Sequence, residues 1–561
     1  MTGAQALIES LKCANVEHMF GYAGATICPA VDALAGAPEI GYTLVRTEQN
    51  AGHMASGYYR VTGKVGVCMV TSGPGATNLI TGIATAYMDS IPMVAITGQV
   101  PSHLLGRDIF QEVDITGAVA PFSKHSYLVK NANDIPRIVA EAFHIASTGR
   151  PGPVLIDIPK DVQVAECDFI PQGVVEAYPQ DEVSDEAIDQ AVELINAARK
   201  PYIYIGGGAA SVGMSQDIMA LAEKIDACIG CSFMGLSAIP HSYERFLGMQ
   251  GMHGQYASSM ANKEADLIIG VGVRFSDRAT GNTAKYAKGA KIIQLDADLA
   301  EINKNIPVDV GLIGDIASSF SRILQRCQPQ SHPEWQEQIA ALKAEGKRIS
   351  DLAEQKATVP LTPKKLFDAI NAVKDARTII ATDVGQHQMW TAQHVTFEQP
   401  RRFASSGGLG TMGYGLGAAI GAAVATGDRT VLITGDGSFG MNLNELATAV
   451  SYNLPITIVV VNNGVLGMVR QWQTLFYGQR YSSTVLNRKT DFVKLAEAFG
   501  ACAQRVDTPE AFRKAFEEAM QHDGPYLIDT IIDMDEFVLP MLPPGGSIED
   551  MITTKEQGAN K

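Results

Sequence analysis

Two strongly apolar segments joined by a Gly-Asp-Gly triplet most constrain how this chain can fold. Residues 430–434 (TVLIT) and 456–461 (ITIVVV) are short, β-branched and apolar without alternation. That pattern is typical of parallel strands buried on both faces. After the first segment, Gly435-Asp436-Gly437 permits a tight turn. Apolar residues at helical spacing follow, at Leu443, Leu446, Ala447 and Val450. The sequence therefore predicts a strand, a turn, a helix and a second strand within an open parallel α/β sheet.

Both predicted strands end in residues suited to binding an ion. Asp436 follows the first strand, and Asn462-Asn463 ends the second. Because ligands of open parallel sheets bind beyond the carboxyl ends of the strands, these side chains are expected at one edge. A carboxylate and an amide oxygen would leave other positions of octahedral Mg²⁺ for water and phosphate oxygens. An ordinary turn explains the Gly-Asp-Gly triplet alone equally well.

The whole composite, GDG followed by one helix, one strand and NN, resembles the signature of thiamine diphosphate enzymes. The resemblance implies that Asp436, Asn463 and the backbone at Val465 hold Mg²⁺ on the cofactor's diphosphate. It also implies that Met412 lies under the cofactor and forces its bent shape. The cofactor contacts implied in this way are Gly24, Gln386, His387, Gly410, Met412, Gly437, Ser438 and Met468.

Length and composition narrow the remaining possibilities. A chain of 561 residues is expected to form three or four domains. The net charge of -16 and the lack of a basic block argue against nucleic acid as a partner. No signal peptide precedes the first amphipathic helix, and the apolar run 413–427 is too short and glycine-rich to span a membrane, so a cytoplasmic protein is expected. Cys228 and Cys231 are expected to be buried thiols.

Short apolar strands alternate with helical stretches along most of the chain, which predicts the α/β class with doubly wound parallel sheets. A polar linker is expected over about 167–185, and a charged helical connector over 334–355. With the family resemblance, the expected units are a pyrimidine-binding domain (1–165), a central FAD-binding-like domain (186–335), a domain for diphosphate and Mg²⁺ (361–535) and a tail closing over the site (536–561).

Glu48 ends a strand-like run and begins a predicted helix. Local sequence explains a glutamate there by the helix dipole. The family resemblance instead implies a catalytic role, because thiamine enzymes place a glutamate at this position against N1′ of the aminopyrimidine. A carboxylate sharing a proton with N1′ lets the pyrimidine act as the internal base that removes the C2 proton.

Further segments resemble the acetohydroxyacid synthases within this family. They are 110–114 (FQEVD), 124–125 (KH), 247–254 (LGMQGMHG), 272–278 (GVRFSDR) and 540–545 (PMLPPG). The resemblance implies that Arg278 holds the carboxylate of the acceptor keto acid, a task suited to a guanidinium, and that Trp472 shapes the acceptor pocket. The implied substrate residues are Phe110, Gln111, Lys124, Arg278 and Trp472, and the implied FAD contacts are Gly254, Arg274, Asp296 and Asp315.

The activity implied by this resemblance is decarboxylation of pyruvate on thiamine diphosphate and condensation of the two-carbon unit with pyruvate or 2-ketobutyrate. This is the first common step of valine, leucine and isoleucine biosynthesis, and FAD would have a structural role. A related 2-keto acid decarboxylase or pyruvate oxidase would share Glu48 but would not need Arg278 and Trp472 together. A flavin or nucleotide-binding protein without thiamine would leave the GDG and NN motifs unexplained.

Because Glu48 and Asp436 lie in different domains, the resemblance implies a homodimer or homotetramer in which the glutamate comes from the other subunit. A small regulatory subunit is a further partner of such enzymes. Four positions depart from the family pattern: Ala23, Ala25, Ser276 and Gly417.

Overall fold

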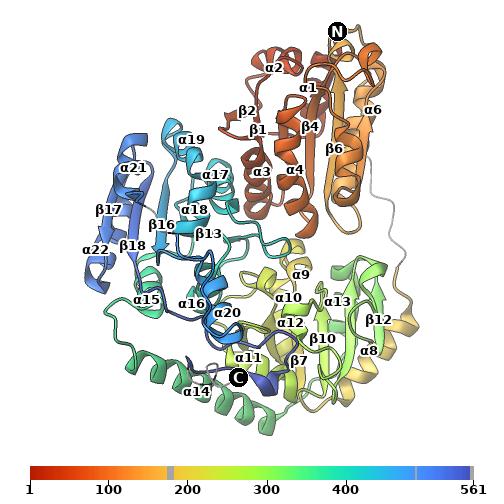
Figure 1. Ribbon diagram of the computed structural model, residues 1–561. Coiled ribbons are helices and arrows are strands. Elements are labelled where there is room, and N and C mark those ends of the chain that lie inside the picture. Colours follow the sequence, from red (N-terminus) through yellow and green to blue (C-terminus); the bar gives the residue numbers. More distant parts are fainter. Residues whose placement is uncertain (174–181, 487–488, 556, 558–561) are drawn as a thin grey trace.

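The computed structural model describes residues 1–173, 182–486, 489–555 and 557. It contains three six-stranded sheets in which every pair of neighbouring strands is parallel (Figure 1). This confirms the predicted α/β class with three parallel-sheet units. The part of the expected linker at 174–181 lies outside the described residues.

The first sheet has the strand order β2-β1-β3-β4-β6-β5. Its central strands β3 and β4 are buried along their whole length, which explains their apolar, non-alternating sequences. The strands are β1 (His18–Tyr22), β2 (Gly41–Leu44), β3 (Gly66–Val70), β4 (Met93–Gln99), β5 (His125–Leu128) and β6 (Pro153–Pro159). The helices are α1 (Gly3–Cys13), α2 (Cys28–Ala35), α3 (Glu48–Thr62), α4 (Pro74–Met88), α5 (Ile115–Val119), α6 (Ile135–Ser147) and α7 (Lys160–Val164).

The second sheet has the order β12-β11-β10-β7-β8-β9. Cys228 and Cys231 lie in its strand β8 as buried thiols, as predicted, and burial raises the pKa of Cys228 to about 12. The strands are β7 (Pro201–Ile205), β8 (Cys228–Cys231), β9 (Phe246–Met249), β10 (Leu267–Val271), β11 (Lys291–Asp296) and β12 (Val310–Ile313). The helices are α8 (Asp185–Ala197), α9 (Gly207–Val212), α10 (Ser215–Lys224), α11 (Tyr256–Glu264), α12 (Asp277–Thr280), α13 (Ile316–Arg326) and α14 (Pro333–Gln355).

The third sheet has the order β14-β13-β15-β16-β18-β17. Its strands are β13 (Ile379–Thr382), β14 (Phe403–Ala404), β15 (Thr430–Gly435), β16 (Ile456–Asn462), β17 (Cys502–Val506) and β18 (Tyr526–Ile531). Its helices are α15 (Pro363–Val373), α16 (Gln386–His394), α17 (Tyr414–Thr426), α18 (Asp436–Asn442), α19 (Leu446–Ser451), α20 (Gly467–Phe476), α21 (Phe492–Phe499) and α22 (Pro509–Gln521).

One local prediction in this sheet was wrong. The triplet at 435–437 was expected to form a turn, but α18 begins directly at Asp436 with Gly435 as its N-cap. Gly435 has extended backbone angles (φ -94°, ψ 158°), so the chain passes from strand to helix without an intervening loop. An acidic residue in the first turn also suits the helix dipole.

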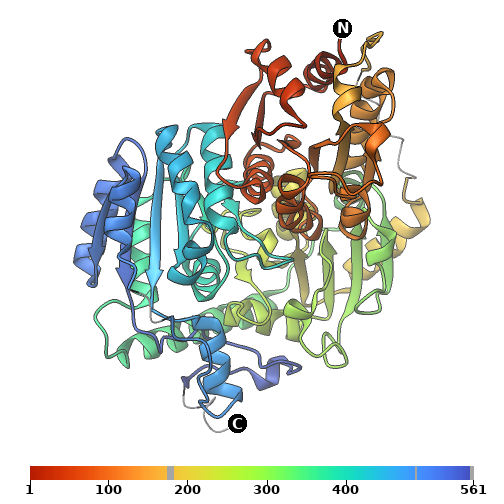
Figure 2. The same ribbon diagram turned by 45° about the horizontal axis from the view of Figure 1, so that its top comes forward.

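Helices α3 and α17 join the first domain to the third (Figure 2). Small residues let them approach closely: a Cβ on Gly421 would meet the Met54 carbonyl, and one on Gly417 would lie 2.8 Å from His53 Cβ. Gly417, which departs from the family pattern, is therefore one of the glycines that let α3 approach α17 closely. The apolar run 413–427 serves helix packing, as predicted. No helix of the described residues is long and apolar enough to cross a membrane.

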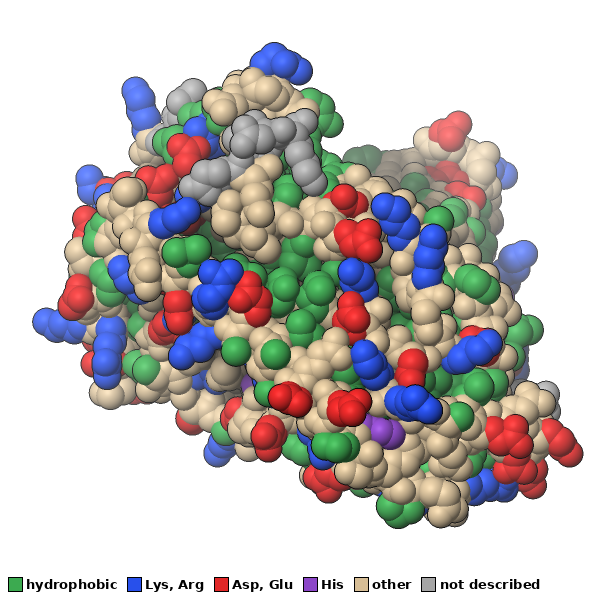
Figure 3. Space-filling view, turned by 90° about the horizontal axis from the view of Figure 1, so that it is seen from below, with side chains coloured by type: hydrophobic (Ala, Val, Ile, Leu, Met, Phe, Trp, Pro, Cys, Tyr) green, Lys and Arg blue, Asp and Glu red, His purple; other side chains and the backbone are tan. Residues whose placement is uncertain are grey.

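Helix α14 runs along the lower edge of the molecule from the second domain toward the third (Figure 1). Only Trp335 and Ile339 are buried in it, which fits the solvated connector expected there. The face seen from below carries interspersed acidic and basic side chains (Figure 3). This face offers no continuous basic surface for a nucleic acid backbone.

Candidate functional site

The carboxyl ends of β13, β15 and β16 bring the predicted metal ligands to one edge of the third sheet. Asp436 follows β15 and is only 1% exposed. Asn463 follows β16, and its amide nitrogen donates to Gln386 Oε1 at 3.2 Å. Gln386 opens α16 after β13. The Asn463 amide oxygen accepts the Val465 N–H at 3.2 Å, so the loop at 463–465 is folded back on itself.

The same edge provides a cradle that fits a diphosphate. Gly437 has little room for a side chain: a Cβ would lie 3.0 Å from Leu466 Cδ2 and 3.7 Å from Met412 Cε. Ser438 Oγ donates to the Val384 carbonyl at 2.9 Å. His387 is buried, and its Nε2 has no hydrogen-bond partner within the described chain. Burial lowers the pKa of His387 to about 3, so the ring is neutral at neutral pH and can donate or accept one bond toward a ligand.

The loop before α17 places Met412 beside Gly437. Gly410 and Gly413 have φ values of 72° and 87°, a backbone conformation that side chains disfavour, so the loop turns sharply on both sides of Met412. Met468, on α20, is half-buried and packs against the hydrophobic core shared with the second domain. The sequence-predicted cofactor residues of the third domain thus come together at one edge.

Glu48 opens α3 in the first domain, as predicted. Its Oε2 accepts a hydrogen bond from Asn78 at 2.9 Å, and a Cβ on Gly75 would lie 3.3 Å from its Oε1. Gly24 lies against Thr71, where a Cβ would be 2.5 Å away, and Thr71 leads into the turn at 72–75. The glutamate and Gly24 therefore flank one glycine-rich turn, and the hydrogen bond to Glu48 comes from the first domain itself.

The predicted substrate residues Phe110 and Gln111 lie on the loop between β4 and α5. Phe110 is 86% exposed. Gln111 has a φ of 62° and packs against Gly73, where a Cβ would lie 2.9 Å from Gln111 Cα. This loop therefore reaches the turn that also carries the Glu48 contacts. Lys124 is held elsewhere, because its ammonium donates to the Thr148 carbonyl.

Sequence reasoning missed Asp157, which braces this loop through Gln99. Gln99 Nε2 donates to the Val113 carbonyl at 2.8 Å and to Asp157 Oδ2 at 2.9 Å. Thr97 Oγ1 donates to the other Asp157 oxygen at 2.7 Å. Asp157 is 1% exposed, and desolvation raises its pKa to about 7. A single aspartate inside an apolar strand belongs to no motif. Only its charge, within the otherwise apolar run 153–159, could have indicated a special role for Asp157.

This buried carboxyl predicts a pH-dependent stability of the first domain. The folded pKa near 7 exceeds the ordinary value of 3.8, so folding takes up a proton between these pH values. The contribution of Asp157 to stability is therefore largest below about pH 4 and falls as the pH rises toward 7, by at most about 4 kcal/mol. Amide exchange of β4 and β6 at pH 5 and 8, corrected for intrinsic rates, measures the effect. The change in corrected exchange rate between pH 5 and pH 8 should be smaller in Asp157→Asn than in the parent protein. An equal change in both proteins would contradict the prediction.

The second domain holds the residues predicted to contact FAD. A Cβ on Gly208 would lie 2.8 Å from Gly272 Cα, and Gly254 is enclosed by the backbone at Gln250. His253 is buried, and its Nδ1 lacks a partner among the described residues. Asp296 ends β11, and burial raises its pKa to about 6. The glycines let backbone segments of the second domain pack closely, and His253 Nδ1 is the group here that is left for a ligand.

Two other predicted FAD contacts are used partly by the protein itself. Asp315 caps α13 by accepting the Ser318 N–H at 2.8 Å. The Arg274 carbonyl accepts a bond from Asn305, while its side chain is half-buried. Ser276, which departs from the family pattern, is the N-cap of α12.

The C-terminal tail gathers the two predicted acceptor residues. Arg278 is 62% exposed, and its Nη1 lies 3.4 Å from Met252 Sδ. The Leu542 N–H donates to the Met252 carbonyl at 2.8 Å, so the tail lies directly over this segment. Met252 and Trp472 pack against the same small apolar cluster of Leu475, Met541 and Ile552. Trp472 Nε1 is buried without a partner among the described residues.

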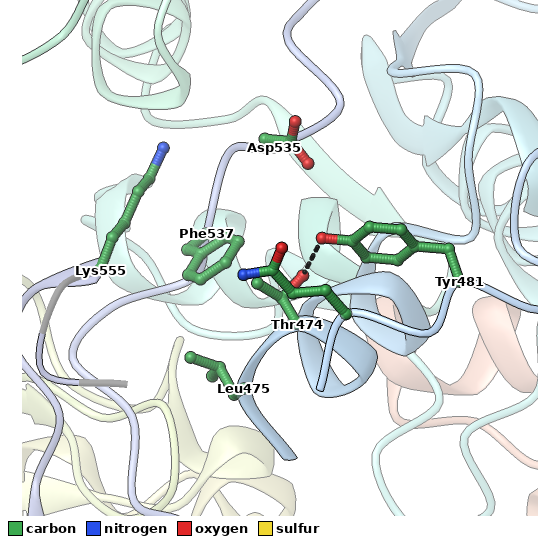
Figure 4. A pocket seen from close by; sticks show the side chains of 7 residues that line it. Thr474, Leu475, Tyr481, Asp535, Phe537 and Lys555 are labelled. Carbon is green, nitrogen blue, oxygen red and sulfur yellow. Dashed lines mark hydrogen bonds between the residues drawn. The ribbon is translucent and has the colours of Figure 1, made fainter. Parts of the chain in front are cut away.

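A pocket of about 340 Å³ lies between α20 and this tail (Figure 4). Its polar lining groups pair with their neighbours: Tyr481 with Thr474 at 3.2 Å, and Asp535 with Arg470 at 2.8 Å. Lys555 lies over the Phe537 ring. The Asp535–Arg470 pair thus joins the segment before the tail to α20 beside this pocket.

Gln471 is a further residue that sequence reasoning missed. Its side-chain oxygen accepts bonds from Gln386 at 3.0 Å and from the Val538 N–H at 2.9 Å. It therefore ties the turn carrying Gln386 to the tail. A glutamine on an amphipathic helix gives no sequence signal for such a role.

Comparison with known protein families agrees with this architecture in all three domains. The model of the thiamine pyrophosphate enzyme N-terminal TPP binding domain matches residues 1–118. The central-domain model matches 188–323, and the C-terminal TPP binding domain model matches 383–530.

Curated relatives match the chain over nearly its full length. The acetolactate synthase large subunit of Corynebacterium glutamicum is 46% identical over 98% of this chain and 90% of the relative. The acetolactate synthase isozyme 2 large subunit of Escherichia coli K12 is 45% identical over 98% of this chain and 99% of the relative. An acetolactate synthase of Arthrospira platensis is 44% identical over 98% of both. With its three matching domains, the chain therefore belongs to the thiamine pyrophosphate enzyme family, among the acetolactate synthase large subunits.

Proposed function

We propose that this chain makes acetolactate from pyruvate with residues of all three domains, and acetohydroxybutyrate when 2-ketobutyrate is the acceptor. The observation that carries the carboligase assignment is that Arg278 and Trp472 both reach the region of Met252 under the C-terminal tail. A guanidinium there suits the carboxylate of a second keto acid, which a simple decarboxylase does not bind.

Asp436, Asn463 and the Val465 carbonyl would hold Mg²⁺, and Gln386, His387, Gly410, Gly437, Ser438 and Met468 would surround the diphosphate. Asp436 and Asn463 supply the hard oxygen ligands that Mg²⁺ prefers, and the remaining positions suit phosphate oxygens and water. Glycine at 437 lets Leu466 and Met412 pack against the start of α18. Met412 beside it would support the bent cofactor.

Glu48 would hold a proton at N1′ of the aminopyrimidine. Thiamine diphosphate, when bound, supplies a thiazolium carbon that accepts the electron pair released on decarboxylation. Asn78 donates to one Glu48 oxygen and leaves the other oxygen for N1′. Gly24 lies at the same turn.

Phe110 and Gln111 would border the substrate, with Arg278 on the acceptor carboxylate. Lys124 would join them only by leaving the Thr148 carbonyl. Trp472 and the tail would exclude water, which matters because protonation of the activated carbon would release acetaldehyde. In the second domain, Arg274, Gly254, Asp296 and Asp315 would hold FAD in a structural role, since the net reaction transfers no electrons to a flavin.

On this proposal the complete site draws on a second copy of the chain. The Glu48 carboxylate is bonded within the first domain, while Asp436 lies at an edge of the third. We therefore propose a homodimer or homotetramer in which each glutamate serves the other subunit's cofactor. The relatives from C. glutamicum and E. coli are named large subunits, which supports a small regulatory subunit as a further partner.

Product analysis tests this function. Purified protein is incubated with pyruvate, Mg²⁺, thiamine diphosphate and FAD, with and without 2-ketobutyrate. Acetolactate, joined by acetohydroxybutyrate when 2-ketobutyrate is present, is the expected result. Acetaldehyde or acetate as the main product would overturn the carboligase assignment in favour of a decarboxylase or an oxidase.

Replacing Trp472 by leucine is expected to change acceptor choice more than turnover. A smaller side chain on α20 enlarges the acceptor pocket. The preference for 2-ketobutyrate over pyruvate should therefore fall by about 10- to 100-fold, the range for a changed hydrophobic pocket contact. The measurement is the ratio of the two products at fixed acceptor concentrations. Phe476→Leu, on the same helix and in ring contact with Trp472, is the control. An unchanged product ratio in Trp472→Leu would contradict the role.

A further inference from the structure

Asp89 of the first domain binds the backbone of a segment that belongs to the third. Its Oδ1 accepts the Gly408 N–H at 2.6 Å, and its Oδ2 accepts the Gly407 N–H at 3.3 Å. The Asp89 side chain is completely buried. These bonds cross 319 and 318 residues of sequence. They therefore arise only when the two domains are docked.

Arg60 completes the arrangement from helix α3. Its Nη2 donates to Asp89 Oδ2 at 2.6 Å, and its Nε donates to the Tyr414 hydroxyl at 2.8 Å. The Arg60 side chain is only 7% exposed. Ser56, one turn earlier, bonds the same hydroxyl at 2.9 Å. The Arg60 guanidinium thus connects Asp89, which binds residues 407–408, to Tyr414, which opens α17.

A third contact fixes the middle of this segment. Thr85 on α4 and Thr411 share a hydrogen bond between their hydroxyls at 2.7 Å. Residues 407–414 are therefore held at three points by the C-terminal halves of α3 and α4. The next residue after Thr411 is Met412, and the sharp turns at Gly410 and Gly413 flank it.

The two glycines allow the segment to pass between all three domains. A Cβ on Gly408 would lie 2.6 Å from the Met88 carbonyl of the first domain. A Cβ on Gly407 would lie 3.0 Å from Phe233 Cδ1 of the second domain. Gly407 is exposed and Gly408 is half-buried, so Asp89 supplies a fixed acceptor for both N–H groups in place of exchanging water.

We propose that Asp89, held by Arg60, is a positioning residue that fixes the segment 407–413 and so sets the place of Met412 at the cofactor edge. The proposal rests on the function proposed above, because Met412 is expected to support the bent cofactor. A charged acceptor suits this task, since bonds to a carboxylate are about twice as strong as neutral ones. The first domain thereby preorganises the third domain's half of the site within one chain.

Asp89→Asn tests the proposal with two readouts. In the cofactor-free protein, amide exchange of the peptide covering 405–413 is expected to rise about tenfold, because an amide oxygen replaces a charged acceptor. In the loaded enzyme, the dissociation constant of thiamine diphosphate should rise and kcat should fall, each by about tenfold. The KM for pyruvate should stay within about twofold, because the substrate contacts are untouched.

The control is Asp226→Asn in the second domain. Asp226 is also buried, pairs with Arg245 at 2.7 Å and accepts the His332 N–H, but it is not bonded to 407–413. It should leave exchange of the 405–413 peptide and cofactor binding unchanged. Equal effects of both substitutions would reduce the role of Asp89 to general stability and overturn the proposal.

Asp89→Asn leaves the buried Arg60 charge without its ionic partner, and the variant could fail to fold for that reason. A double variant keeps the test valid in that case. Arg60→Met with Asp89→Asn removes that charge and still loses the charged acceptor, so the segment should remain loosened. Unchanged exchange, or faster exchange with unchanged cofactor binding and kcat, would overturn the proposal. If the parent protein binds thiamine diphosphate but makes no acetolactate, the proposed function fails, while the exchange and binding comparisons still decide the role of Asp89.

Discussion

Replacing Glu48 by glutamine is expected to abolish acetolactate formation while thiamine diphosphate remains bound. Glutamine keeps the size of the side chain and can still accept the bond from Asn78, but it cannot hold a proton at N1′. General acid–base groups contribute about 10²- to 10⁴-fold to rate, so kcat should fall within that range. The diphosphate and Mg²⁺ contacts lie in another domain and are unaffected. Initial rates with pyruvate and equilibrium dialysis of the cofactor measure the two properties.

The matched control is Glu17→Gln in the same domain. Glu17 is exposed and pairs with Lys64, so its loss should leave both rate and cofactor binding unchanged. A Glu48→Gln enzyme that retains more than about a tenth of the parent's kcat would contradict the role of Glu48. Loss of cofactor binding together with activity would also count against it, because the residue would then act in binding and not in proton transfer.

Replacing Asp436 by asparagine is expected to remove Mg²⁺-dependent binding of thiamine diphosphate. The substitution keeps the shape of the buried side chain but removes the negative charge that would balance the metal ion. The affinity for the cofactor should fall at least about 100-fold, the upper part of the range seen for residues that support metal sites. Titration of cofactor-free protein with thiamine diphosphate, at saturating and at zero Mg²⁺, separates metal-dependent from metal-independent binding.

Asp428 offers a control at the opposite end of the same strand. It precedes β15 and pairs with Arg377 and Arg402, so Asp428→Asn should weaken surface pairing without changing cofactor affinity. Parent-like Mg²⁺ dependence in Asp436→Asn would refute the metal assignment. That outcome would leave the Gly-Asp-Gly triplet as a strand-to-helix transition only.

Local sequence predicted the framework of the site because buried strands have a strong pattern. The strands β15 and β16, the start of α3 at Glu48 and the buried helix α17 all lie where apolar runs and glycines indicated. The same reasoning misjudged residues 435–437. Two glycines around an aspartate favour a turn in isolation, but here Gly435 continues the strand and α18 begins at Asp436.

The positions of other predicted residues depended on contacts that no local pattern specifies. The tail reaches Arg278 and Trp472 through Met252, nearly 300 residues earlier in the chain, by the bond of the Leu542 N–H to the Met252 carbonyl. Gln111 reaches the turn at 72–75 because it packs on Gly73. Neither contact follows from hydrophobic periodicity, since each joins two loops.

The sequence by itself determined the three parallel sheets and the residues at the strand ends. Burial on both faces of a sheet requires apolar runs without alternation, and the chain direction then fixes the edge where ligands bind. The tertiary structure alone decided how the domains meet. Asp89 bonds Gly408, and α3 packs closely against Gly417, only when the first and third domains dock. Such long-range hydrogen bonds and close approaches depend on three-dimensional complementarity, which local propensity does not encode.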